Sequence, residues 1–181
     1  MAEIRSTLEL VMERTRHLSM TEEDKRKQAA AAFKEAVSRL ARKYLDGQIN
    51  LDRFQAELNQ LGGGASGRKD AAAEIGRRID PAADNTLLLD LIKNGLSFDI
   101  SGIEAILHHF SETVHCGEDQ VVESIKADLL GKGIFGSAVI PNLEADKGWA
   151  RRRREMIETV REELDSQIAQ LKLHQYDKSF S

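Results

Sequence analysis

Residues 149–173 read WARRRREMIETVREELDSQIAQLKL, and their apolar side chains recur at the spacing of one helix face. The residues that define this face are Ile157, Leu164, Ile168 and Leu171. Such spacing lines them up along one side of an α-helix, and that side must be buried against another element. We therefore expect one long helix over 149–173, about 37 Å in length at 1.5 Å per residue.

A similar apolar seam lies near the other end of the chain, in residues 3–18 (EIRSTLELVMERTRHL). It consists of Ile4, Leu8, Val11, Thr15 and Leu18. Each of the two seams covers only about two heptads, which is too short for a self-sufficient coiled coil. We therefore expect the helix over 149–173 to pack on the N-terminal helices or on a second subunit.

Three further amphipathic stretches predict helices in the first half of the chain, at about 22–45, 51–61 and 68–79. Thr21 with Asp24, or Ser19 with Glu22, has the spacing of an N-terminal capping box, and Asn50 is suited to cap the second of these helices. Between the second and third helices, residues 62–67 (GGGASG) hold four glycines in six positions. This composition is typical of a flexible linker and suggests a boundary between two parts of the chain.

Residues 85–100 fit two structures. Asn85 can cap a helix over the leucine-rich run that follows, whereas Asn94 and Gly95 could form the two-residue turn of a β-hairpin. In the hairpin, Leu96, Phe98 and Ile100 would alternate with polar residues as in a half-buried strand. We favour the helix, because leucine rather than β-branched residues dominates the run, and the small hairpin near 87–100 remains open.

Ser101 and Glu104 have the spacing of another capping box, which predicts a helix from 101 to about 115. Gly117 is expected to end it, and a further helix is expected over 118–130. The chain is thus predicted to be all-α. We divide it into an N-terminal helical region (1–61), the glycine-rich linker (62–67), a middle helical domain (68–148) and the long C-terminal helix (149–173).

The formal net charge of −4 argues against a generally basic nucleic-acid-binding protein. The acidic excess is concentrated in residues 81–148, whose 4 basic and 11 acidic side chains favour a solvated acidic surface. The single cysteine, Cys116, cannot form a disulfide within the chain, which is consistent with a cytoplasmic location. We see neither a signal peptide nor an apolar run of the length a membrane span needs, so no membrane association is expected.

One stretch of the chain carries a cluster of metal-capable side chains. On a helix, Glu104, His108, Glu112 and His115 would share a face opposite the apolar one, and imidazole and carboxylate groups can bind zinc or iron. Because that face would be exposed to water, we favour a solvated polar helix surface and assign no metal site.

The run Arg151–Arg154 could contact phosphates. On a helix, however, four consecutive arginines point to all sides, and acidic residues follow at the distance of intrahelical ion pairs. Nucleic-acid binding is therefore disfavoured.

No nucleophile lies in a recognisable catalytic motif, so the sequence assigns no catalytic residue and no cofactor. The function we favour is a non-enzymatic cytoplasmic interaction or scaffold protein that self-associates through its terminal helices, as a homo-oligomer or with a protein partner. The alternatives are a metal-dependent enzyme or metal sensor built on the histidine-containing helix, and a nucleic-acid-associated protein that uses the arginine run.

Overall fold

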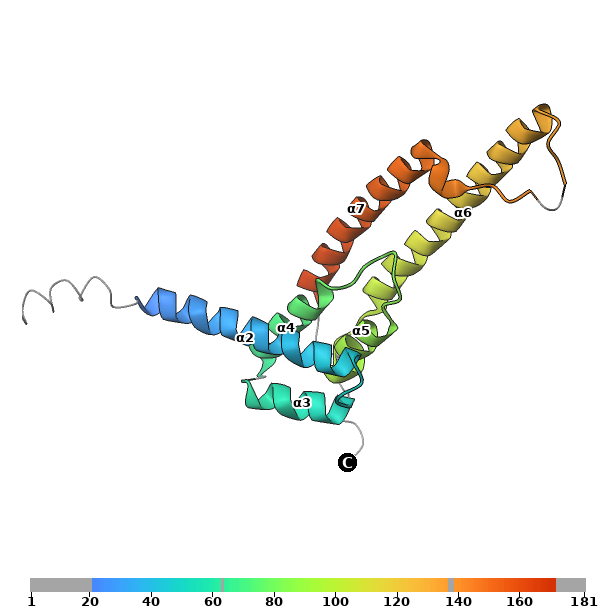
Figure 1. Ribbon diagram of the computed structural model, residues 1–181. Helices are drawn as coiled ribbons and strands as arrows, with labels where there is room; N and C mark the ends of the chain where they lie inside the picture. Colours follow the sequence, from blue (N-terminus) through green and yellow to red (C-terminus); the bar gives the residue numbers. More distant parts are fainter. Residues whose placement is uncertain (1–20, 63, 137–138, 172–181) are drawn as a thin grey trace, which may run out of the picture.

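The computed structural model describes residues 21–62, 64–136 and 139–171, and the regular structure within these ranges is helical, without a strand (Figure 1). The elements are, in order, α2 (Glu22–Leu45), α3 (Leu51–Gln60), α4 (Ala65–Gly76), α5 (Thr86–Asp90), a π-helical turn η1 (Leu91–Gly95), α6 (Ser101–Gly131), a 3-10 turn η2 (Leu143–Ala145) and α7 (Lys147–Ala169). The predicted all-α fold class is confirmed. The seam predicted over 3–18 lies outside the described residues.

Local sequence signals set several helix starts. Thr21 and Asp24 form the predicted capping box of α2, in which each side chain accepts a hydrogen bond from the backbone N–H of the other residue. Asn50 caps α3 by accepting a hydrogen bond from the N–H of Arg53 at 3.0 Å. Helix α7 begins two residues earlier than predicted, because Asp146 accepts a hydrogen bond from the N–H of Trp149 and so caps the helix.

The leucine-rich segment forms α5 and continues into η1, as the favoured helical prediction required. Asn94 and Gly95 lie inside this helical segment, so the hairpin alternative is wrong. Asn85 precedes α5 without capping it. Its side chain instead accepts a hydrogen bond from the N–H of Asp80 and donates to the carbonyl oxygens of Asp80 and Ala83, which fixes the preceding loop.

Two predictions about residues 101–130 are wrong. Ser101 does not form a capping box with Glu104, because Asp99 accepts the hydrogen bond from the Ser101 N–H and the residue before the helix is Ile100. Gly117 does not end a helix either, since α6 runs unbroken from Ser101 to Gly131. Glycine costs a helix about 1 kcal/mol relative to alanine. A glycine at position 117 is explained by Trp149, whose ring packs directly against the backbone of α6 at that residue.

Buried residues from both sides of the glycine-rich segment share one hydrophobic core. Helices α2, α3, α4 and the turn η1 surround it, and the first turns of α6 and the last turns of α7 enter it. Part of the predicted linker is helical, because α4 begins at Ala65. The half of α2 nearest its start extends beyond this core, and residues 21–32 are exposed on all sides (Figure 1).

Helices α6 and α7 form a long antiparallel hairpin that projects from the core (Figure 1). Two of the four seam residues of α7 are buried within the chain, Leu164 at 3% and Ile168 at 8% exposure, and the other two, Ile157 and Leu171, are partly buried. The main neighbours of α7 among the described elements are α6 and α4. The predicted packing on the N-terminal helices or on a second subunit stays a prediction, because residues 1–20 lie outside the described part of the chain. At Gly76 on α4 the absence of a side chain gives Ile168 room to approach. None of the helices in the described ranges is long and apolar enough to cross a membrane.

Candidate functional site

The metal-capable side chains predicted on α6, Glu104, His108, Glu112 and His115, do not form one group but belong to separate pairs. The Nε2 atom of His108 lies 3.4 Å from a carboxylate oxygen of Glu112, and His115 lies 3.7 Å from Asp119. Glu104 pairs with Lys93 on η1 at 3.7 Å. These side chains are about half exposed or more, and within the described part of the chain no three His, Cys, Asp or Glu side chains come together as a possible metal site.

The arginine run is spread around the first turns of α7. Arg151 forms an ion pair with Glu155 at 2.8 Å, and this hydrogen-bonded carboxylate raises the pKa of the guanidinium. Arg152 lies over the ring of Trp149, 5.6 Å from its centroid. Arg153 and Arg154 line a hollow of about 450 Å³ on another side of the helix. The four guanidinium groups therefore do not form one phosphate-binding surface.

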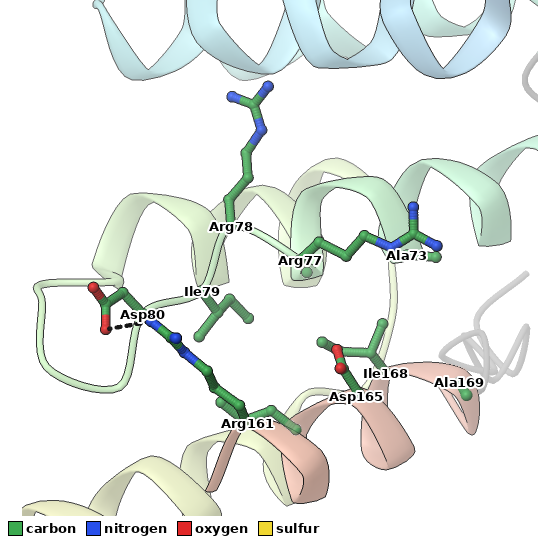
Figure 2. A pocket seen from close by; sticks show the side chains of 11 residues that line it. Ala73, Arg77, Arg78, Ile79, Asp80, Arg161, Asp165, Ile168 and Ala169 are labelled. Atoms are coloured by element: carbon green, nitrogen blue, oxygen red, sulfur yellow. Dashed lines mark ion pairs between the residues drawn. The ribbon is translucent and has the colours of Figure 1, made fainter. Parts of the chain in front are cut away.

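A hollow of about 650 Å³ lies between the end of α4 and the last turns of α7 (Figure 2). Figure 2 shows three arginines around it whose guanidinium groups point apart. Arg78 reaches α2, where it donates to the hydroxyl and carbonyl oxygens of Ser38. Arg161 lies 3.9 Å from Asp80, and Arg77 extends along α4 towards Glu74. Because each guanidinium has its own partner, these side chains do not converge on a ligand.

A second hollow, the α6–α7 groove, runs along the hairpin and has a volume of about 740 Å³. Its apolar lining comes from Phe110, Gly117, Trp149, Met156 and Val160. Small side chains form part of its walls, namely Thr113 and Cys116 on α6 and Thr159 on α7. Three carboxylates, Glu112, Glu155 and Glu163, border it together with the cations or polar groups His109, Gln120 and Arg152. The groove is thus apolar inside, with an acidic excess at its edge.

The free end of the hairpin carries a cluster of exposed apolar residues, which we call the hairpin tip. Its members are Leu130 (63% exposed), Ile134 (50%), Phe135 (76%) and Ile140 (88%). They lie where α6 ends and in the loop that leads back to α7, at the end of the hairpin that is remote from the core (Figure 1). A single exposed leucine is ordinary on a protein surface, whereas a cluster of this kind marks a candidate contact surface.

The largest pKa displacement belongs to a structural contact. The phenol of Tyr44 on α2 donates a hydrogen bond to a carboxylate oxygen of Asp90 on α5, which raises the pKa of Tyr44 to about 12. The ring of Tyr44 also packs edge-on against Phe54 of α3, with 6.3 Å between centroids. A tyrosine that holds its proton so firmly is unsuited to act as a base, so this contact joins three helices.

Neither a protein-family model, nor a curated protein, nor a solved structure matches this chain. The hairpin tip was not predicted from the sequence to be an exposed surface. The signal was present, because Ile134, Phe135, Val139 and Ile140 form an apolar stretch between glycines and Pro141 without a charged residue. Such a stretch is equally typical of a buried segment, and the sequence alone could not distinguish the two.

Proposed function

We propose that this chain is a non-enzymatic interaction protein that binds protein through its α6–α7 hairpin. The observation that carries the proposal is the hairpin tip, whose four large apolar side chains are at least half exposed. Their individual exposed areas add up to on the order of 500 Å², and exposed apolar surface of this extent often has a function. Contact with another protein would remove this surface from water.

The hairpin is well suited to present such a surface. Ile103 near the start of α6 is 1% exposed, and Leu164 and Ile168 near the end of α7 are buried in the same core. Both helices are therefore anchored at their core end, which holds the opposite end away from the core (Figure 1).

Self-association remains part of the proposal, but through the α6–α7 hairpin rather than through the two apolar seams near the chain ends. The seam residues Leu164 and Ile168 of α7 are buried within the chain, so these two side chains are not free for a second subunit. A reducing compartment such as the cytoplasm fits the proposal, because the exposed thiol of Cys116 is the only one in the chain. No specific observation favours the metal-dependent or nucleic-acid-associated alternatives.

Site-specific photo-crosslinking tests this proposal. A benzophenone side chain placed at Phe135 in the full chain, expressed in cells, should give discrete covalent adducts with protein. The matched control is the same group at Glu158, an exposed position on α7 outside the groove and the tip. Equal and diffuse labelling from both positions would contradict the proposal. Mass spectrometry of the adducts identifies whether the captured protein is another protein or a second copy.

A further inference from the structure

One face of α6 carries two pairs of side chains that can bind a metal ion. The Nε2 atom of His108 lies 3.4 Å from a carboxylate oxygen of Glu112. The Nε2 atom of His115 lies 3.7 Å from a carboxylate oxygen of Asp119. Two donor atoms of a tetrahedral zinc ion, each about 2.0–2.1 Å from the metal, lie about 3.4 Å apart. Each pair therefore already has nearly the spacing of two ligands that share one ion.

These four residues, which we call the α6 stripe, lie on one side of the helix. They follow one another at intervals of four, three and four residues, which is the spacing of neighbours along a helix face. Gly117, which packs against Trp149 of α7, comes two residues after His115 and so lies on the opposite side of α6. The side chains of the stripe are 64–79% exposed. The stripe is therefore accessible to another molecule beside the hairpin.

Each pair by itself is only half of a metal site. Zinc is almost always held by four donors, and in the described part of one chain no third His, Cys, Asp or Glu side chain joins either pair. The two pairs are centred about 10 Å apart along the helix, so they cannot share one ion. A single chain therefore provides neither a closed zinc site nor the metal centre of an enzyme.

The order of the ligands lets a second copy supply the missing half. His108 and Asp119 are the two ends of the stripe, and Glu112 and His115 each lie four residues inside them. When two α6 helices lie antiparallel about a two-fold axis, the first pair of one copy faces the second pair of the other. Each of the two sites then contains two imidazoles and two carboxylates, which are suitable donors for four-coordinate zinc.

We propose that a divalent transition-metal ion such as zinc joins two copies of this chain through the α6 stripe, with the two α6 helices antiparallel. The fold favours this direction, because Glu104, next to the stripe, lies 3.7 Å from Lys93 of η1. Parallel copies would bring both η1 turns into the contact at the same height, whereas antiparallel copies keep them apart. Helices that cross at about 20° hold both sites in register while their ends diverge. This inference goes beyond the proposed function, since the stripe does not include the hairpin tip.

The charge of α6 makes the association depend on the metal. Between Ser101 and Gly131 the helix has six acidic residues and one lysine. Two such helices repel each other at neutral pH, where histidine is mostly uncharged. Two divalent ions bring four positive charges to the contact and offset this repulsion. Magnesium, which prefers oxygen ligands, should not replace zinc, because imidazole supplies half of the donors.

Light scattering with a zinc salt tests the proposal. The metal-free protein should have the 20.2 kDa mass of one chain, and one zinc ion per chain should double that mass. Removal of zinc by a chelator should restore the single-chain mass, and magnesium at the same concentration should leave it unchanged.

Two adjacent histidines provide a matched pair of variants. His108 belongs to the stripe, whereas His109 is also exposed but is turned about 100° away around the helix axis. His108→Ala removes a donor from both sites, so half-formation of the dimer should need at least about tenfold more zinc. His109→Ala should leave the zinc dependence unchanged. Circular dichroism should show both variants folded, because both positions are exposed.

Complementation between half-stripe variants distinguishes the antiparallel arrangement from a parallel one. The variant His108→Ala, Glu112→Ala keeps only the second pair, and the variant His115→Ala, Asp119→Ala keeps only the first. Each variant alone should stay a single chain in zinc, because an antiparallel dimer of it has at most two ligands at each site. An equimolar mixture should form a mixed dimer with one zinc ion, because one site is then complete. In a parallel arrangement each variant alone would dimerise.

Several results would each overturn this inference. They are a single-chain mass in excess zinc, a dimer that persists without metal, equal effects of His108→Ala and His109→Ala, dimerisation of either half-stripe variant alone, and a zinc-dependent mass that grows beyond two copies. The photo-adducts formed at position 135 test the proposed function separately, because that position lies outside the stripe.

Discussion

Replacement of Gly117 by alanine should have two opposing effects on the stability of the protein. Alanine is preferred to glycine within a helix by about 1 kcal/mol, and Gly117 lies in the interior of α6. The new Cβ atom, however, would lie 2.6 Å and 2.7 Å from the Cζ3 and Cη2 atoms of Trp149. Carbon atoms make favourable contact at about 3.5–4.0 Å, so the added methyl group would overlap the indole ring.

The position of Trp149 decides which effect is larger. The residue is only 5% exposed, and its backbone N–H is held by Asp146 at 2.7 Å, so the rigid ring has little room to move away. Overpacking of this kind costs about 1–3 kcal/mol. Subtraction of the gain in helix propensity leaves a net destabilisation of about 1 kcal/mol, equivalent to a loss of about 2–4 °C in Tm for a chain of this size.

Urea unfolding followed by circular dichroism measures this difference. Gly131 provides the matched control, because it is the last residue of the same helix and a Cβ atom there would contact nothing within 4 Å. Gly131→Ala should be neutral or stabilising by about 0.5 kcal/mol. In a Trp149→Ala background the overlap is absent, so Gly117→Ala should change sign and stabilise the protein by about 1 kcal/mol. If Gly117→Ala stabilises the unmodified protein as well, Trp149 does not pack on α6 and the reasoning is refuted.

Three further outcomes are expected. Leu164→Asp should lower the free energy of unfolding by about 4 kcal/mol or prevent folding, because Leu164 is 3% exposed. Leu130→Asp at the exposed tip should leave the Tm nearly unchanged. Equal effects of the two variants in thermal unfolding would contradict the burial of Leu164. Asn85→Ala should lower the free energy of unfolding in urea by about 2–3 kcal/mol, because the 7% exposed amide makes three hydrogen bonds to the preceding loop. A neutral result would show that the loop does not need these hydrogen bonds. The folded-state pKa of Tyr44 is raised, so the stability it contributes should be complete below pH 10 and lost as pH rises through about 12. Phenolate absorbance should show Asp90→Asn returning that pKa towards 10, and an unchanged titration would rule out the hydrogen bond as its cause.

The sequence by itself determined the features that depend on neighbouring residues. The caps at Thr21 and Asn50 were predicted because a side chain and a backbone N–H three residues later meet in any helix start. The alternation of Leu96, Phe98 and Ile100 correctly indicated burial, with each side chain at most 2% exposed. The strand that the same alternation also suggested does not form, because a strand requires a pairing partner from elsewhere in the chain.

Only the tertiary structure decided the features that depend on distant partners. Gly117 could end a helix or admit a neighbour, and the choice was made by Trp149, which lies far along the chain. The α7 seam had to be buried, but its spacing could not distinguish α4 and α6 from other helices. Likewise, Ile134, Phe135 and Ile140 are exposed because α6 extends past the start of α7 (Figure 1). Periodicity and caps report interactions within a few residues, whereas burial depends on which surfaces meet in space.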